Sequence, residues 1–171
     1  MREELRGKVV LVGGATGALG KAVARAVAGT EANLALTSTS GEALEELAEE
    51  LDLPDERVYA STVNATDPDS VGDLVSGVVD RFGSLHALLN TIGGWGGGKA
   101  VAETKIEDWE WMLTLNLRTA FLMSRAVLPQ MMEAGWGRIV HTGSKTALQP
   151  RAKEAGYAVA KSGLITLTET I

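Results

Sequence analysis

The sequence predicts an α/β fold in which a doubly wound parallel sheet lies between two layers of helices. Two observations support this expectation. Short runs rich in valine and leucine alternate with longer segments of helical character along all 171 residues, as in successive βαβ units. The first of these runs, residues 8–12, is apolar after its lysine and shows no alternation, which is expected of a strand covered on both faces. A chain of this length without a linker or a repeat is expected to form one domain, residues 1–171.

The first half of the chain contains the expected strands and helices in strict alternation. The strands are expected at 8–12, 33–37 and 57–62, and the helices at 21–28, at 42–51 and from Asp67 to about Phe82. Asp67 and Pro68 form a typical helix start, because aspartate caps the first turn and proline fits its backbone. Gly83 is a typical helix end.

The second half continues the alternation. Strands are expected at 85–91 and 138–142, a final helix at 156–171, and either one long helix or two short helices between 106 and 134. A very glycine-rich loop, residues 93–98, follows the fourth strand.

Composition and charge argue against several classes of function. The net charge is −6 and no basic run exceeds two residues, which argues against nucleic acid as a partner. There is no cysteine, and the two histidines, His86 and His141, are isolated, so no metal site is expected. No apolar run approaches the roughly 18 residues of a membrane span, and the charged start has no apolar signal core. These features predict a cytoplasmic protein without a membrane segment.

A glycine-rich loop joins the first strand to the first helix and reads Gly13-Gly14-Ala15-Thr16-Gly17-Ala18-Leu19-Gly20. Strand, glycine loop and helix in this order are the setting of a dinucleotide fingerprint. The glycines let the backbone turn sharply and approach a pyrophosphate, which binds at the start of the helix. An ordinary tight turn is the simpler alternative, but the setting favours phosphate binding.

Tyr157 and Lys161 form a second pattern with chemical meaning. They are four residues apart in the expected final helix, so their side chains lie on one face, about one turn apart. An ammonium beside a phenol lowers the pKa of the phenol from about 10, which makes it a usable acid or base near neutral pH. Ser144, at the end of the preceding strand, could hold a carbonyl oxygen beside that phenol. Taken alone, most such pairs are solvated helix surface.

In combination, these motifs resemble those of the short-chain dehydrogenases/reductases, over essentially the whole chain and in the family's order. The matching segments are Gly14-x-x-Gly17-x-x-Gly20, Asn64-Ala65-Thr66-Asp67, Asn90-Thr91-Ile92-Gly93, Asn116, Ser144 and Tyr157-x-x-x-Lys161. Ser144 and Tyr157 are 13 residues apart, which is the usual separation in the family.

Some of these segments depart from the family pattern. Ala18 replaces the middle glycine of the usual loop, so the glycine spacing is closer to that of the family's extended members. Asn64 stands where aspartate is more common. The segment that begins at Asn90 keeps only the first asparagine and the glycine of Asn-Asn-Ala-Gly.

The resemblance implies a three-layer Rossmann-like fold with the strand order 3-2-1-4-5, and a catalytic set of Asn116, Ser144, Tyr157 and Lys161. Tyr157 would protonate a carbonyl oxygen during reduction, or accept a proton in the reverse direction. Lys161 would lower the pKa of Tyr157 and hold the nicotinamide ribose, and Ser144 would orient the carbonyl. Asn116 would hold a water through a local helix irregularity.

The resemblance also implies which residues contact the coenzyme. They are Gly14, Thr16, Gly17, Leu19, Gly20, Thr37, Ser38, Asn64, Ala65, Asn90 and Gly93, together with Tyr157 and Lys161. The end of the second strand, residues 37–40, lacks the acid that selects NAD, which favours NADP. NAD stays an alternative, because no arginine or lysine follows that strand either.

The implied function is that of an NAD(P)-dependent oxidoreductase, which transfers hydride between nicotinamide and a carbonyl or alcohol substrate. Reduction of a 3-oxoacyl group is one candidate activity. A non-catalytic dinucleotide-binding or regulatory protein on the same fold is the alternative, and an epimerase or dehydratase of the extended type is suggested by the glycine spacing alone. Trp95 and residues 148–150 are expected at the mouth of the pocket, and His141 is expected to pack in the core or at a strand edge.

The sequence stops at Ile171, about two turns past Lys161, whereas full-length family members continue through a sixth strand, a substrate-covering segment and a seventh strand. The fold is therefore expected to be C-terminally truncated relative to the family, either as a shortened form or as a natural short variant. The fifth strand would then lie at an edge. Family members commonly pair through the long helix and the final helix, so a homodimer or homotetramer is expected.

Overall fold

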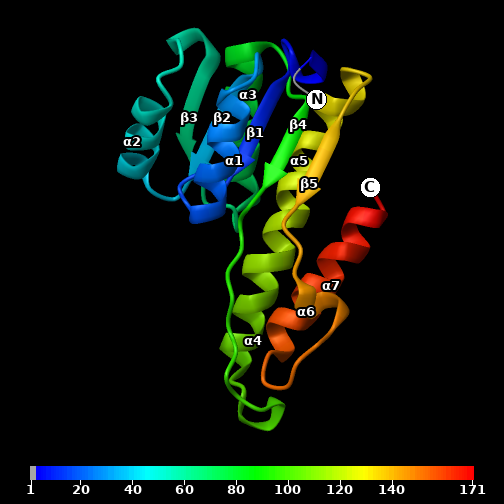
Figure 1. Ribbon diagram of the computed structural model, residues 1–171. Coiled ribbons are helices and arrows are strands. Elements are labelled where there is room, and N and C mark those ends of the chain that lie inside the picture. The colour runs from blue at the N-terminus through cyan, green and yellow to red at the C-terminus, as the bar shows by residue number, and fades with distance from the viewer. Residues whose placement is uncertain (1–2) are drawn as a thin grey trace.

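A five-stranded parallel sheet with the order β3-β2-β1-β4-β5 forms the centre of the structure, a computed structural model that describes residues 3–171 (Figure 1). The predicted strand order is thus confirmed. Every neighbouring pair of strands is parallel. The strands are β1 (Val9–Gly13), β2 (Asn33–Ser38), β3 (Val58–Thr62), β4 (Ala87–Asn90) and β5 (Arg138–His141).

Helices cover both faces of the sheet, as the predicted three-layer fold requires. One face packs against α1 (Ala18–Ala28) and α2 (Gly41–Leu51), and the other against α3 (Pro68–Phe82) and α5 (Thr119–Glu133). Successive residues of the central strand β1 point to opposite faces of the sheet. Val10 packs in the core beneath α1 and α2, and Leu11 packs in the core beneath α3 and α5. Because both faces are buried, β1 is an apolar run without alternation.

The ends of α3 lie where the sequence predicts them. The side chain of Asp67 accepts a hydrogen bond from the backbone N–H of Asp69 at 3.2 Å, and proline follows at the first helical position. Gly83 ends the helix in the left-handed conformation, with φ of 76°. Local capping chemistry therefore determines this helix at both ends.

The segment expected as one long helix or two short helices is one continuous helical run with an irregular middle. It consists of α4 (Ile106–Leu113), a π-helical segment (Thr114–Arg118) and α5. The helix irregularity expected around Asn116 is therefore present, and Asn116 is buried within it. Figure 1 shows α4 extending past the carboxyl ends of the strands, where the loop after β4 runs beside it.

The last part of the described chain packs beside this long helix. The short helix α6 (Lys145–Leu148) precedes α7 (Ala155–Glu169), and α7 packs against α4 and the π-helical segment. Residues 3–171 also contain three turns of 3-10 helix, at Glu3–Leu5, Asp55–Arg57 and Val101–Glu103. Among residues 3–171, no helix has the length and apolar character needed to cross a membrane.

Candidate active site

The strand ends bring the predicted site residues to one edge of the sheet. In the register of the sheet Gly13 pairs with Thr37 on one side and with Asn90 on the other, and Asn90 pairs with His141. The loops that follow these strands therefore start side by side. In open parallel sheets, ligands bind at this carboxyl edge.

Two adjoining hollows open along this edge. The first, here called the Ser38 hollow, has a volume of about 230 Å³ and is lined by Thr16, Ser38, Thr39, Val63, Ala65 and Leu115, among others. The second, the Tyr157 hollow, has a volume of about 290 Å³ and is lined by Leu19, Trp95, Thr142, Gly143, Tyr157 and Lys161, among others. Gly17, Thr91 and Gly93 line both hollows. The two hollows are thus two ends of one extended surface.

The glycine loop between β1 and α1 needs its glycines for two different reasons. Gly14 has φ of 73°, a backbone conformation that residues with a Cβ atom rarely adopt. Gly20 lies so close to the loop that a Cβ atom there would come within 2.1 Å of the Gly14 carbonyl oxygen. No side chain caps the start of α1 at Gly17, and no acidic residue lies in its first turn. The free N–H groups of that turn are therefore available to an anion.

Hydroxyl groups line the end of β2. The Ser38 and Thr16 hydroxyl oxygens lie 2.5 Å apart and connect the second strand to the glycine loop. Thr37 is fully buried and donates its hydroxyl hydrogen to the Ser61 carbonyl oxygen at 2.7 Å. Of the two residues predicted here, Ser38 lines the hollow, and the side chain of Thr37 instead ties β2 to β3.

Asn116 fastens the loop after β4 to the long helix. Its Oδ1 accepts from the Gly94 N–H at 3.1 Å, and its Nδ2 donates to the Gly94 carbonyl at 2.9 Å and to the Met112 carbonyl at 3.2 Å. A Cβ atom at Gly93 would lie 2.8 Å from Asn116 Oδ1, so the loop can approach this closely only because glycine stands there. The water-holding role expected of Asn116 stays a prediction.

Lys161 is a buried cation with unused hydrogen-bonding capacity. The side chain is 3% exposed, and its Nζ donates to the Thr142 carbonyl oxygen at 2.8 Å. No other hydrogen bond or ion pair of Lys161 occurs within residues 3–171, which leaves two of its three N–H groups free. Burial lowers the pKa of Lys161. Its Nζ lies 5.9 Å from the centre of the Tyr157 ring, so the pair expected from the four-residue spacing is present in the Tyr157 hollow.

Ser144 lies near this pair but does not line the hollow, whereas its neighbour Gly143 does. The Ser144 Oγ accepts from the Thr146 N–H at 3.2 Å and caps α6. A serine hydroxyl that accepts one hydrogen bond still has its own hydrogen to donate. Capping and orientation of a carbonyl are therefore compatible roles for the same atom.

Some of the remaining predicted residues line one of the hollows, and others lie outside the hollows. Ala65 lines the Ser38 hollow, whereas Asn64 is exposed and its Oδ1 accepts from the N–H and the hydroxyl of Thr66. Trp95 lines the Tyr157 hollow and is 65% exposed, whereas Leu148, also expected at the mouth, is exposed without lining it. Asn90 is buried and supports the hollows from within the sheet.

Sequence reasoning missed several residues of this edge. Thr91 lines both hollows and donates to the Gly13 carbonyl at 2.7 Å, and its position directly after Asn90 was the available signal. Thr142 carries the carbonyl that Lys161 contacts, and a backbone acceptor leaves no trace in a residue pattern. Among the described residues, no three His, Cys, Asp or Glu side chains gather as a metal site requires.

Comparison with known proteins relates the chain to one family. It matches the short chain dehydrogenase family over residues 8–171. It is 32% identical over 167 residues to a 3-oxoacyl-[acyl-carrier-protein] reductase of Vibrio cholerae, and 29% identical over 166 residues to a D-beta-hydroxybutyrate dehydrogenase of Rhizobium meliloti. A crystal structure of NAD+-bound xylitol dehydrogenase matches with a TM-score of 0.89 at 32% identity. These matches cover 96–98% of this chain and 64–67% of each relative, so the chain spans about two thirds of their length.

Proposed function

The chain belongs to the short-chain dehydrogenase family, and we propose that it is an NAD(P)-dependent oxidoreductase acting on a carbonyl or alcohol substrate. The observation that carries this proposal is the pair Tyr157 and Lys161 in a hollow continuous with the glycine loop. A phenol beside a buried ammonium is suited to moving a proton. A long hollow at the start of a helix is suited to a dinucleotide.

The residues present fit a nicotinamide dinucleotide. The N–H groups at the start of α1 would hold the pyrophosphate, which can approach closely because Gly14 and Gly17 carry no side chain. The Ser38 hollow, with the apolar Val63 and Ala65, would take the adenosine half. The Tyr157 hollow would take the nicotinamide half, where the free N–H groups of Lys161 would donate to ribose hydroxyls. When bound, the dinucleotide supplies or accepts the hydride.

The side chains around the Tyr157 hollow would handle the proton. In reduction, the Tyr157 phenol donates its hydrogen to the carbonyl oxygen of the substrate, and in oxidation it accepts the hydrogen back. The ammonium of Lys161 lies 5.9 Å from the centre of the Tyr157 ring, so its positive charge would partly offset the negative charge that this step leaves. Ser144 donates its hydroxyl hydrogen to the same carbonyl oxygen and so stabilises the negative charge that develops there. Asn116 keeps the loop of Gly93 and Gly94 in place beside Lys161.

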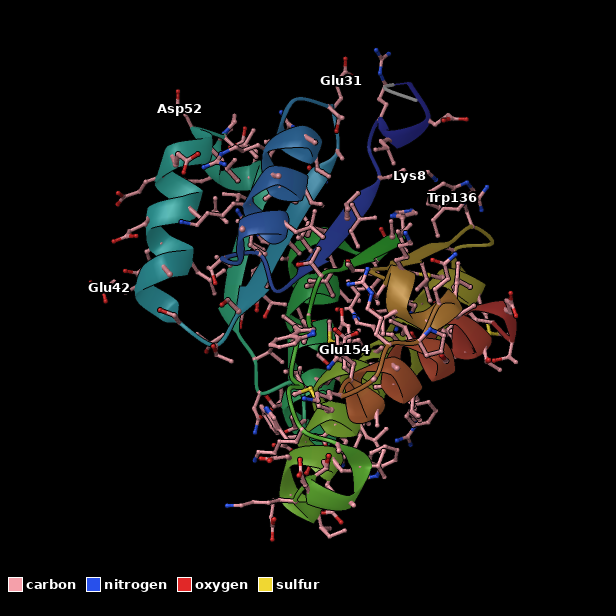
Figure 2. All side chains as sticks on the ribbon, turned by 60° about the horizontal axis from the view of Figure 1, so that its bottom comes forward. Lys8, Glu31, Glu42, Asp52, Trp136 and Glu154 are labelled. Carbon is pink, nitrogen blue, oxygen red and sulfur yellow. The ribbon has the colours of Figure 1, made fainter. Side chains whose placement is uncertain are left out.

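NADP is the proposed coenzyme. A carboxylate at the end of the second strand would bind the ribose hydroxyls of NAD and repel a 2′-phosphate. Here that position is Ser38, followed by Thr39, and both line the hollow. The nearest acid along the chain, Glu42, is exposed and points outward from α2 (Figure 2). A phosphate at this end of the hollow would therefore meet hydroxyl groups and no carboxylate.

A 3-oxoacyl thioester is the proposed substrate class. This proposal is supported by the likeness to the reductase of Vibrio cholerae, whose name states that it acts on 3-oxoacyl groups carried by a protein. The exposed Trp95 at the Tyr157 hollow gives an extended acyl chain an apolar surface to contact.

The 171-residue chain itself should be tested first by coenzyme binding. We expect calorimetry to detect NADPH binding with an affinity at least tenfold higher than that of NADH. An acetoacetyl thioester should then oxidise the bound NADPH, which is followed by its absorbance. Binding without turnover of any carbonyl would favour the non-catalytic alternative, and no binding of either coenzyme would contradict the proposal for this chain.

A homodimer or homotetramer is proposed as the state of the chain in solution. The long helix and α7, through which the family commonly pairs, carry large exposed apolar side chains, namely Trp111, Phe121 and Val159. Such side chains on neighbouring helices are typical of interaction surfaces. Analytical ultracentrifugation should give at least twice the mass of 18.0 kDa, and replacement of Phe121 by glutamate should lower it.

A further inference from the structure

Three polar side chains form a connected chain at the carboxyl edge of the sheet, next to the two hollows. Asn90 ends β4, His141 ends β5 and Ser124 lies on α5. Asn90 and Ser124 are each 2% exposed. Asn90 Nδ2 lies 3.2 Å from His141 Nδ1, and Ser124 Oγ lies 3.1 Å from His141 Nε2.

The direction of each hydrogen bond follows from Asn90. Its Oδ1 accepts from the Ile92 N–H at 3.2 Å, so its amide nitrogen is the group that faces His141. An amide nitrogen only donates, and the Nδ1 atom of His141 must therefore accept. The hydrogen of the neutral imidazole is consequently on Nε2, which donates to Ser124.

Asn90 in turn supports the segment that forms both hollows. The N–H that it holds belongs to Ile92, whose neighbours Thr91 and Gly93 line the Ser38 hollow and the Tyr157 hollow alike. The Asn90 carbonyl oxygen also accepts from the N–H and the hydroxyl of Thr142, at 3.2 and 3.1 Å. Thr142 is the residue whose carbonyl oxygen contacts Lys161. Asn90 is thus the junction between His141 and the two hollows.

We propose that His141 is a positioning residue for the coenzyme site. By accepting a hydrogen bond from Asn90 Nδ2, it fixes the orientation of the Asn90 amide and, through Ile92, the Thr91–Gly93 segment that the hollows share. The inference rests on the proposed function, because it assigns His141 to the same dinucleotide site. It makes the coenzyme affinity depend on the protonation of a residue that does not touch the coenzyme.

Protonation of His141 would disturb this arrangement. A protonated imidazole donates from both nitrogens, so its Nδ1 would meet the Asn90 amide nitrogen as a second donor. Asn90 could relieve this conflict only by turning its amide over, which would direct Nδ2 at the N–H of Ile92. In either case the Thr91–Gly93 segment would lose the hydrogen bond at Ile92 and would be held mainly by the bonds of Thr91 to Gly13.

The surroundings of His141 keep it neutral near pH 7. Burial first, and the positive charge of Lys161 second, lower the pKa of His141. Lys161 on α7 is the charged group that acts on it, whereas β4 and α5 present the neutral side chains of Asn90 and Ser124. The affinity for NADPH should therefore be constant near neutral pH and should fall as the pH is lowered below about 6.5.

Two substitutions separate the positioning role from mere packing. His141→Asn places an amide where Nδ1 stands, so it can still accept from Asn90 but does not titrate. His141→Gln reaches Ser124 instead and leaves Asn90 without an acceptor. We expect His141→Asn to bind NADPH within about twofold of the unchanged chain at pH 7.5 and to lose the acid dependence that comes from His141. We expect His141→Gln to bind about tenfold more weakly, which corresponds to about 1.4 kcal/mol.

The measurement is NADPH binding by calorimetry between about pH 5.5 and 8. The 2′-phosphate of NADPH titrates in the same way for every variant, so the difference between variants isolates His141. His86→Asn, at the opposite end of the sheet, is the matched control and should keep the acid dependence. The inference is overturned if His141→Asn keeps the full acid dependence, or if His141→Gln binds as tightly as the unchanged chain.

A second readout does not need the coenzyme. In nuclear magnetic resonance spectra of the free chain, the amide signals of Ile92 and Gly93 should shift with the titration of the His141 ring, and should not do so in His141→Asn. Amide signals that ignore the titration would overturn the inference. If the unchanged chain bound no NADPH while these signals followed His141, the proposed function would be wrong and the positioning of the segment by His141 would stand.

Discussion

Asn116 and Gly94 are joined by hydrogen bonds in both directions: the Gly94 N–H donates to the Asn116 side chain, and the Gly94 carbonyl accepts from it. The two residues are 22 positions apart, one in the glycine-rich loop after β4 and the other in the π-helical segment. The π-helical segment places the amide of Asn116 inside the structure, where it meets this loop. A local irregularity of the helix thereby determines the shape of the Tyr157 hollow.

Replacement of Asn116 by leucine should destabilise the chain and weaken NADPH binding. The change keeps the size of the side chain but leaves the N–H and carbonyl of Gly94 without partners. We expect the free energy of unfolding in urea to fall by about 2 kcal/mol. Asn64→Ala is the control, because its hydrogen bonds are at the surface and should contribute less. If the two variants lost the same free energy of unfolding, this role of Asn116 would be contradicted.

Tyr157→Phe should strongly reduce turnover in a chain that still binds NADPH. The change removes the hydroxyl that is proposed to donate the proton, and it keeps the ring beside Lys161. We expect the rate with an acetoacetyl thioester to fall by at least about a hundredfold. Tyr59→Phe is the matched control, since Tyr59 belongs to the core beside α3 and not to the hollow. If Tyr157→Phe retained the turnover of the unchanged chain, the Tyr157 hydroxyl would not be the proton donor.

Gly20→Ala should disrupt the glycine loop. Its added Cβ atom would lie 2.1 Å from the Gly14 carbonyl oxygen, so the start of α1 must move away from β1. We expect a loss of about 2–3 kcal/mol in the free energy of unfolding and no measurable NADPH binding. Gly72→Ala is the control in another helix, because no atom outside the neighbouring backbone of that helix lies within 4 Å of its Cβ position.

The control should itself have a measurable effect of the opposite sign. Alanine is the better helix former, and Gly72→Ala should raise the free energy of unfolding by about 0.5–1 kcal/mol. If Gly20→Ala kept the stability and the NADPH binding of the unchanged chain, α1 would not approach the glycine loop after β1 as closely as described.

Ser38→Asp should exchange the coenzyme preference. A carboxylate at the end of β2 can accept from the ribose hydroxyls of NAD and repels the 2′-phosphate of NADP. We expect the affinity for NADPH to fall at least tenfold and that for NADH to rise. Ser38→Ala is the control and should preserve the order of the two affinities. If NADH already binds more tightly to the unchanged chain, the proposed preference for NADP is wrong.

His86 should make the stability of the fold depend on pH. Its Nδ1 accepts from the Val9 N–H at 3.1 Å, next to the Trp136 ring, which also contacts Lys8 (Figure 2). Burial first and Lys8 second lower the pKa of His86. The unfolded chain then binds more protons than the folded chain below about pH 6.5, so stability is complete above that pH and decreases as the pH falls through this window.

Urea unfolding at several pH values between about 5.5 and 7.5 tests this dependence. His141, whose pKa is also lowered, adds a slope of the same sign, so the double variant His86→Gln, His141→Asn is the informative one. It should lose most of the decrease in stability between about pH 6.5 and 5.5. If the free energy of unfolding of the double variant depended on pH as steeply as that of the unchanged chain, other titrating groups would be responsible for the dependence.

The order of strands and helices was predictable because its signals are local. Apolar runs without alternation indicate the buried strands, and the cap formed by Asp67 and the end at Gly83 follow from a few neighbouring residues. The same holds for the glycine loop between β1 and α1. Tyr157 and Lys161 were recognisable as a pair because a helix brings residues four apart onto one face.

What the tertiary structure alone decided are contacts between segments far apart in the chain. Lys161 meets the carbonyl of Thr142, Asn116 meets the backbone of Gly94, and His141 meets Asn90 across two strands. The Thr37 hydroxyl likewise donates to the Ser61 carbonyl of the neighbouring strand, and a coenzyme contact of Thr37 stays a prediction. Most of these partners are backbone atoms, which every residue possesses, and so no residue type marks them in advance. They are determined only when packing of the helices on the sheet sets the distances between them.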